Sequence, residues 1–220
     1  MMKYFYLLST LLILVILVVS LQNRTFVEGF NNNQTFVLLG DSILQNEAYG
    51  KSVESFLSDK QKNVLCYAQD NATIGEIASQ VNKLPVKELN NSNTLVFLSA
   101  GGNNLLSHYV YQNQDLTNKS ILNNIFENYT KLVANIQNKL PNAKLVLLDI
   151  YYPYDSHFKK LHSIINEWNQ MIYSFANNPD NNIYDVLKIS DTVSEKQDFT
   201  LGIEPSSQGG EKIASLILSL

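Results

Sequence analysis

The chain has 220 residues, a formal net charge of −4 and a hydrophobic fraction of 45%. This composition excludes a disordered chain, and the acidic balance argues against a nucleic-acid partner, which normally requires a basic patch. Because Cys66 is the single cysteine, an internal disulfide framework and a multi-cysteine metal site are excluded. We expect one globular domain with a substantial core and with neither metal nor cofactor.

An apolar segment opens the chain, and no residue between 4 and 21 is charged. As a helix it would be about 27 Å long, close to the hydrocarbon thickness of a bilayer. We therefore predict an N-terminal transmembrane anchor over 1–22, followed by a polar linker over 23–34. A cleaved signal peptide, which would leave a secreted protein, is the alternative, although Val-Val-Ser-Leu at 18–21 makes a poor cleavage site.

After the linker, short apolar runs alternate with amphipathic helical patterns. Continuous apolar runs are typical of strands buried on both faces of a parallel sheet. One helical pattern starts at Thr73 and Glu76, which have capping-box spacing. We expect strands at 35–39, 63–67, 94–98, 144–152 and 182–186, and helices at 74–84, 121–136, 158–175 and 209–220.

This alternation predicts a doubly wound, flavodoxin-like α/β domain over 35–220, with a five-stranded parallel sheet and right-handed crossovers. In such a fold the functional site lies at the carboxyl ends of the strands. Three loops at those ends, 40–43, 68–73 and 99–104, carry residues capable of chemistry.

The first and third loops hold the strongest candidates. Gly40 permits a sharp turn, and we expect Ser42 at the start of a helix, with its hydroxyl exposed and backbone N–H groups facing a developing anion. The alternative is that Asp41 or Ser42 only caps a helix. Asn103 could donate its side-chain amide to an oxyanion, although an asparagine in such a loop is more often a turn residue.

The order of these motifs resembles that of the SGNH, or GDSL-like, hydrolase family over about residues 35–220. Gly-Asp-Ser-Ile at 40–43 is similar to the block that supplies the serine nucleophile. Gly-Asn-Asn at 102–104 is similar to the block whose asparagine lies in the oxyanion hole, and Ile-Glu-Pro-Ser at 203–206 to the final block. The resemblance implies the doubly wound SGNH fold.

The resemblance also implies roles for individual residues. Ser42 is the expected nucleophile and Asn103 an oxyanion donor, with Asp41 and Gly102 as supporting residues. The backbone N–H groups of Ser42 and Asn71 are expected to complete the oxyanion hole. Asn71 stands where the family usually has a glycine, and asparagine tolerates a left-handed backbone better than most residues.

The chain departs from the family pattern at its last block. Glu204 and Leu201 stand where the family has its catalytic histidine and aspartate, and Asn104 replaces the usual aspartate of the third block. This variation is similar to a subgroup with an aspartate shortly before Ile-Glu-Pro-Ser, here Asp198. We hypothesise that Glu204 is the base for Ser42 and that Asp198 orients Glu204. The reference pKa of glutamate is about 2 units below that of histidine, and burial can recover part of the lost basicity.

The resemblance therefore implies a membrane-anchored serine ester hydrolase that acts on a small-molecule, lipid or acylated-glycan ester. A catalytically inactive relative that binds a carbohydrate or acyl ligand through the same cleft is the alternative, favoured by the missing histidine. A nucleotide-binding flavodoxin-like protein is disfavoured because no glycine-rich phosphate loop is present. His108, His157 and His162 match no family position, and we expect them at the surface or partly in the core.

Overall fold

The computed structural model describes residues 34–61, 63–115 and 118–220. The anchor predicted over 1–22 lies outside the described residues, as does the predicted linker except for Gln34. Within the described ranges no helix has the length and apolar character that a membrane crossing requires.

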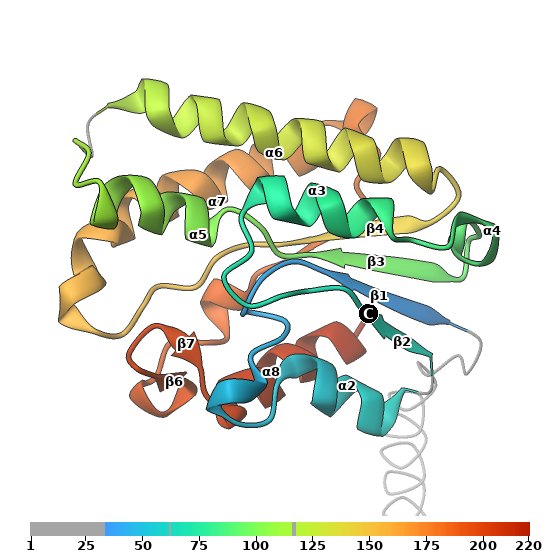
Figure 1. The fold of residues 1–220 in the computed structure, drawn as a ribbon, viewed down its shortest axis with the longest axis horizontal. Helices are drawn as coiled ribbons and strands as arrows, with labels where there is room; N and C mark the ends of the chain where they lie inside the picture. The colour runs from blue at the N-terminus through green and yellow to red at the C-terminus, as the bar shows by residue number, and fades with distance from the viewer. Residues whose placement is uncertain (1–33, 62, 116–117) are drawn as a thin grey trace, which may run out of the picture.

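A five-stranded parallel sheet forms the centre of the domain, as the sequence predicts (Figure 1). The strand order is β2-β1-β3-β4-β5, so the chain crosses to one side of β1 and then returns to the other side. The strands are β1 (Thr35–Leu39), β2 (Val64–Cys66), β3 (Thr94–Leu98), β4 (Lys144–Leu148) and β5 (Asp185–Leu187).

The reversal of strand order places a topological switch point between β1 and β3. In doubly wound sheets, ligands bind outside the carboxyl ends of the strands at such a point. Leu39 pairs with Leu98 in the register, so β1 and β3 end at the same level. The loops that follow them, 40–43 and 99–104, therefore leave the sheet side by side.

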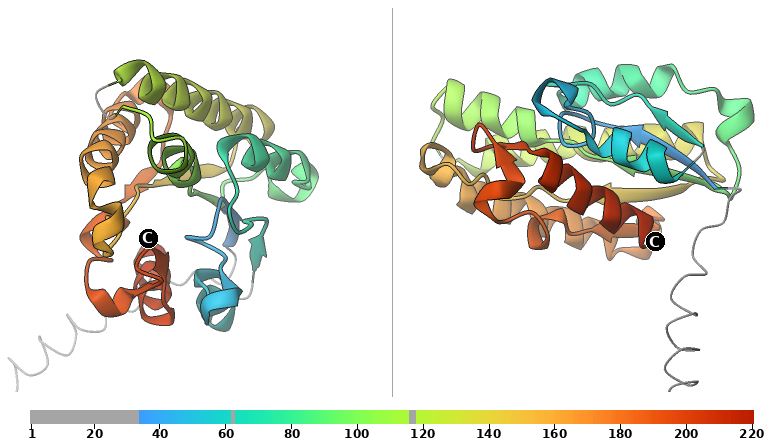
Figure 2. Two further views of the ribbon diagram at one scale, coloured as in Figure 1. Left: turned by 60° about the vertical axis from the view of Figure 1, so that its left-hand side comes forward. Right: turned by 90° about the horizontal axis from the view of Figure 1, so that it is seen from below.

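Helices cover both faces of the sheet because its strands are apolar on both faces (Figures 1 and 2). In β1, Val37 and Leu39 belong to the core on one side, and Phe36 and Leu38 to the core on the other. The first core is covered by α3 (Ile74–Asn82), α6 (Lys119–Lys139) and α7 (His162–Ala176), and the second by α2 (Val53–Lys60) and α8 (Ser207–Leu218).

Two predicted strand boundaries are wrong. β4 ends at Leu148 rather than at residue 152, because the Asn169 side chain on α7 binds both the N–H and the C=O of Ile150 (2.9 and 2.8 Å). β5 begins at Asp185 rather than at residue 182, because Asn182 adopts a left-handed conformation (φ 47°) after a short 3-10 turn. In both cases a local backbone bond or turn replaces the pairing that the apolar run suggests.

Several elements are absent from the sequence-based prediction. No helix was predicted at α5 (Gly102–Leu106), which continues into a π-helical turn over 107–111, and residues 156–161 form a 3-10 helix where the predicted helix 158–175 begins. A short antiparallel hairpin of β6 (Phe199–Thr200) and β7 (Glu204–Pro205) precedes α8. By contrast, the capping box at α3 is confirmed.

Candidate active site

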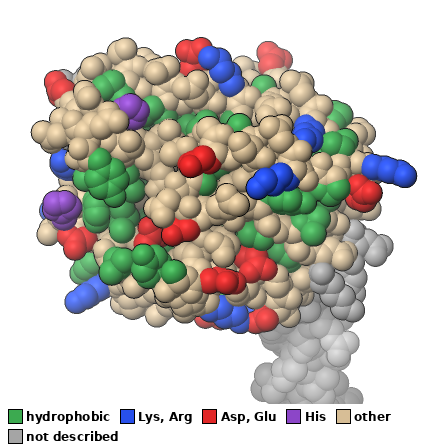
Figure 3. All heavy atoms as spheres, viewed as in Figure 1, with side chains coloured by type: hydrophobic (Ala, Val, Ile, Leu, Met, Phe, Trp, Pro, Cys, Tyr) green, Lys and Arg blue, Asp and Glu red, His purple; other side chains and the backbone are tan. Residues whose placement is uncertain are grey.

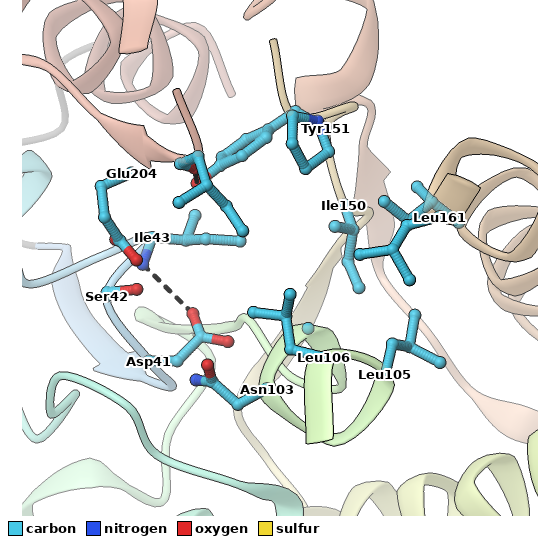
Figure 4. Close-up of a pocket in the computed structure, with 14 residues that line it drawn as sticks. Asp41, Ser42, Ile43, Asn103, Leu105, Leu106, Ile150, Tyr151, Leu161 and Glu204 are labelled. Carbon is cyan, nitrogen blue, oxygen red and sulfur yellow. Dashed lines mark hydrogen bonds between the residues drawn. The ribbon is translucent and has the colours of Figure 1, made fainter. Parts of the chain in front are cut away.

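A cavity opens at the carboxyl ends of β1, β3 and β4 (Figure 4). It leaves about 40 Å³ for the centres of water-sized molecules. Ser42, Asn103 and Glu204, three of the residues predicted to act together, all line this cavity. The remaining lining residues are Asp41, Ile43, Gly102, Leu105, Leu106, Ile150, Tyr151, Pro153, Leu161, Ile165 and Ile203.

Ser42 lies in a single tight turn and not at the start of a helix, which corrects the prediction. The N–H groups of Leu44 and Gln45 donate to the Asp41 carbonyl (3.1 and 3.2 Å), and the next α-helix begins only at Val53. A long helix dipole therefore does not act on the hydroxyl of Ser42. The side chain is also buried, with 7% exposure, rather than openly exposed, and it meets solvent only through the cavity.

Gly40 makes the sharp turn that the sequence predicts. Its φ is +151°, and a Cβ atom at this position would lie 2.5 Å from the Ser99 carbonyl oxygen. The buried side chain of Gln80, on α3, holds the same residue by accepting from the Gly40 N–H (2.9 Å) and donating to its C=O (2.8 Å). Gln80 was missed at the sequence level, although a glutamine on the apolar face of an amphipathic helix is the signal of such a buried role.

Asp41 is almost completely buried, with 2% exposure. Its Oδ1 accepts from the Ser99 hydroxyl (2.8 Å) and from the Ile43 N–H (3.2 Å). Burial raises the pKa of Asp41 to about 7, against the lowering effect of these hydrogen bonds, and the charge of Glu204 raises it further. Asp41 therefore bonds to the turn and borders the cavity, and its supporting role in the site stays a prediction.

Asn103 is positioned by the start of α5. The preceding Gly101 has a left-handed φ of +107°, and a Cβ atom there would lie 2.3 Å from the Trp168 ring. Nδ2 of Asn103 donates to the Ala72 carbonyl (3.0 Å), which leaves its second amide hydrogen for a ligand. Asn104, in the place of the usual aspartate, has a structural role, because its Oδ1 accepts from the Ile74 N–H at the start of α3 (3.0 Å).

Asn71 adopts the left-handed conformation that the resemblance requires, with φ 60°. It is exposed and does not line the cavity. Its place in the oxyanion hole therefore stays a prediction.

Glu204 lies on β7, and its carboxylate faces Ser42 in the cavity (Figure 4). Burial raises its pKa above the usual value, hydrogen bonding by the Ser42 side chain counteracts this effect, and the charge of Asp70 adds to it. Its Oε2 is buried and has no hydrogen-bond partner within the described residues. Tyr151, which sequence reasoning missed, holds the adjacent backbone by donating its O–H to the Ile203 carbonyl (2.8 Å).

Asp198 and Glu204 are not joined by a hydrogen bond in the described part of the chain. The Asp198 carboxylate instead accepts from the N–H groups of Ser194 and Glu195 (both 3.0 Å) and from Lys212 Nζ (2.8 Å). Burial raises the pKa of Asp198, but these bonds outweigh it and hold the pKa below its usual value. The geometry offers no support for an orienting role.

None of the three histidines lines the Ser42 cavity. His162 contacts the Pro153 carbonyl through Nε2 (2.9 Å), His157 packs edge-on against Phe158, and His108 borders a separate groove between α3 and α6. Within the described residues, no histidine is therefore placed in the cavity to act as a base for Ser42.

The sequence matches the GDSL-like lipase/acylhydrolase family over residues 38–211. The chain belongs to this family. No curated protein matches the sequence. The matched range includes the Gly-Asp-Ser-Ile motif at 40–43, the Gly-Asn-Asn motif at 102–104 and Glu204.

Solved structures share the fold of this GDSL-like domain. A member of the lipolytic G-D-S-L family from Veillonella parvula is 17% identical, with a TM-score of 0.66 over 85% of this chain and 97% of its own. An acetylxylan esterase from Geobacillus stearothermophilus is 12% identical, with a TM-score of 0.62 over 84% and 92%. A Clostridium thermocellum family 3 carbohydrate esterase is 21% identical, with a TM-score of 0.57 over 84% and 92%.

Proposed function

We propose that this GDSL-like protein is a serine ester hydrolase in which Ser42 is the nucleophile and Glu204 its general base. The observation that carries this proposal is the meeting of Ser42 and Glu204, from opposite ends of the domain, over one cavity. The Ser42 side chain is close enough to affect the pKa of Glu204 by hydrogen bonding, as a nucleophile and its base require.

The reaction follows the two-step acyl-transfer scheme. Ser42 Oγ attacks the ester carbonyl carbon while its proton passes to the Glu204 carboxylate. The tetrahedral oxyanion accepts hydrogen bonds from the Ser42 N–H and the Asn103 amide. As the intermediate collapses, the alcohol leaves with the proton from Glu204. Water then attacks the acyl-serine, again with Glu204 as base, and releases the carboxylic acid.

The weak basicity of a carboxylate is the main obstacle to this scheme. The difference of about 2 pKa units from histidine corresponds to about 3 kcal/mol of lost driving force. Burial of Glu204 offsets part of this loss, because it raises the pKa of the carboxyl group. We expect a slow hydrolase compared with relatives that keep the histidine.

The cavity favours a short acyl group. A water molecule needs about 10–15 Å³ of such volume, so about 40 Å³ accommodates a few water molecules or an acetyl-sized group. Half of the residues that line it are leucine or isoleucine, which suits the acyl side of the ester rather than a sugar. We therefore propose a short-chain acyl ester of a small molecule or glycan as substrate. The acetylxylan and carbohydrate esterases that share the fold agree with this choice.

We further propose that residues 1–22 anchor the domain in a membrane, as the apolar N-terminal sequence indicates. Extraction of the full chain from membranes only by detergent, and not by high salt or carbonate, is the expected result.

The test is hydrolysis of a short-chain aryl ester by the full chain in detergent, together with labelling by a fluorophosphonate probe. We expect Ser42→Ala to abolish both, and Glu204→Gln to reduce hydrolysis by about 10²-fold or more. Glu211→Gln, on the exposed side of α8, is the matched control and should keep full activity.

Full activity of Glu204→Gln would refute the assignment of the base. Absence of both hydrolysis and labelling in the unaltered protein would instead favour an inactive relative that binds a carbohydrate or acyl ligand. That alternative is favoured by one observation: within the described residues, Asp198 bonds to Lys212 and to backbone N–H groups and not to Glu204.

A further inference from the structure

A second carboxylate, that of Asp41, borders the cavity beside Glu204. Its Oδ1 is engaged by the Ser99 hydroxyl and the Ile43 N–H, whereas its Oδ2 has no hydrogen-bond partner within the described residues. Oδ2 lies 3.8 Å from the position that a Cβ atom of Gly102 would occupy, at the start of α5. In Figure 4 this carboxylate lies beside the Ser42 hydroxyl and the Asn103 amide, where the oxyanion of the proposed reaction forms.

The charges at this site do not balance if every acid is ionised. Glu204 must be a carboxylate to accept the proton of Ser42, and when it becomes neutral the oxyanion of the tetrahedral intermediate carries the negative charge instead. An ionised Asp41 would be a second negative charge throughout the reaction, in a cavity whose lining contains no Lys, Arg or His. Like charges in a buried, weakly polar site cannot all persist, so one group keeps a proton.

Asp41 is the better holder of that proton. It is 2% exposed, whereas Glu204 is only partly buried, so ionisation costs more at Asp41. The groups that face Asp41 are the Ser99 hydroxyl after β3, the Asn103 amide on α5, the Tyr151 phenol after β4 and the Glu204 carboxylate on β7. None of these groups is a cation that would stabilise the ionised form.

We propose that Asp41 keeps its proton on Oδ2 while Glu204 is ionised, and that this O–H donates a hydrogen bond to the carbonyl oxygen of the bound ester and to the oxyanion that follows. Asp41 is then a catalytic residue, and the hole has a carboxylic acid donor besides the Asn103 amide. The proton stays on Asp41 throughout, so the transfer between Ser42 and Glu204 is unchanged. This inference rests on the proposed function, because the oxyanion arises only if Ser42 attacks an ester.

The raised pKa of Asp41, to about 7, agrees with this arrangement. With a single proton on the two acids, the productive form has it on Asp41 and the charge on Glu204. Activity should therefore rise as Glu204 loses its proton and fall again above about pH 7, where Asp41 ionises.

The test compares pH profiles of kcat/KM for the unaltered chain and Asp41→Asn. Asparagine keeps an acceptor for Ser99 and Ile43 and presents an N–H donor that cannot ionise. We expect the fall above about pH 7 to disappear in Asp41→Asn. Activity below that pH should decrease but remain measurable, because an amide N–H is a weaker donor than the O–H of a carboxylic acid. Asp41→Ala should lose about 10²–10³-fold. Asp70→Asn, an exposed acid whose charge acts on Glu204, is the matched control and should keep the alkaline fall.

A readout independent of turnover accompanies the profiles. Infrared difference spectra below about pH 7 should show a protonated-carboxyl band that is missing in Asp41→Asn, and its absence from the unaltered chain overturns the inference. The inference is also overturned if kcat/KM of Asp41→Asn still decreases above about pH 7 as it does in the unaltered chain. In that case, loss of activity in Ser42→Ala would still support the proposed function. If the unaltered chain neither hydrolyses esters nor labels at Ser42, both proposals fail.

Discussion

Replacement of Gln80 by leucine tests how the turn that carries the nucleophile is held. The Gln80 side chain is 1% exposed and satisfies both the N–H and the C=O of Gly40. Leucine fills a similar volume but leaves the Gly40 N–H without a partner, at about 1–3 kcal/mol. The Gly40 C=O keeps its bond from the Gln69 N–H (3.0 Å), so the loss of its second bond costs about 0.5–1.5 kcal/mol. Better burial of the apolar side chain returns about 1–2 kcal/mol. We therefore expect Gln80→Leu to lower the free energy of unfolding by about 1–2 kcal/mol.

The assay is urea unfolding followed by far-ultraviolet circular dichroism, with ester hydrolysis measured on the same samples. Gln170→Leu, at an exposed position of α7, is the matched control and should change the free energy of unfolding by less than about 0.5 kcal/mol. Because Gly40 directly precedes Asp41 and Ser42, hydrolysis should fall more than stability alone explains. A Gln80→Leu variant as stable and as active as the control would refute this account of the turn.

Two further predictions concern buried acids. The folded-state pKa of Asp41 is raised from 3.8 to about 7, so its contribution to stability is complete at low pH and is lost as the pH rises through about 7. Urea unfolding should show that the free energy of unfolding decreases by roughly 4 kcal/mol between about pH 4 and pH 8, and that this decrease is missing in Asp41→Asn. The same pH dependence in both proteins would contradict the prediction. Asp198→Asn should weaken the bond to Lys212 and lower the free energy of unfolding by about 1–3 kcal/mol. Asp198→Asn should not change the pH dependence of hydrolysis. A shift of its acidic limb would instead support Asp198 as the residue that orients Glu204.

The central sheet could be predicted from the sequence because its strands are buried on both faces. The runs at 35–39 and 94–98 are apolar throughout, apart from a leading threonine, and the structure has strands at these bounds. The edge strand was misplaced because Tyr184 is half exposed and the run at 182–186 is partly polar. The left-handed Asn182, and not the apolar content of the run, sets where this edge strand begins.

The candidate site was predictable only where a local motif carries it. Ser42 and Asn103 follow strands that end at the switch point, so their meeting follows from topology. The bonds from Gln80 to Gly40 and from Tyr151 to Ile203 join segments that are distant in the sequence. A pattern in one sequence does not show such contacts, because either side chain could equally be an ordinary core residue.

Apolar side chains gather on the side of the molecule that carries α5 and the β6–β7 hairpin (Figure 3). Leu201 and Gly202 form the tip of this hairpin with positive φ values of 51° and 71°, and Leu201 is 66% exposed. An aspartate at 201, where the family has one, would therefore point into solvent rather than toward the cavity. An aspartate at the tip of this hairpin could not reach the cavity, which agrees with its absence from position 201.

In the proposed reaction, a glutamate base in place of histidine removes the need for an orienting aspartate. In a serine–histidine–aspartate site, the aspartate fixes the tautomer of the imidazole and stabilises its cation. A carboxylate has no tautomer to fix and becomes neutral when it accepts a proton, so a second carboxylate that is itself ionised would add repulsion beside it. What Glu204 needs is a fixed backbone and a buried, uncharged neighbour. The Tyr151 bond to the Ile203 carbonyl supplies the first, and Asp41 supplies the second if it keeps its proton. Asp198, which is bonded to Lys212, then has only a structural role.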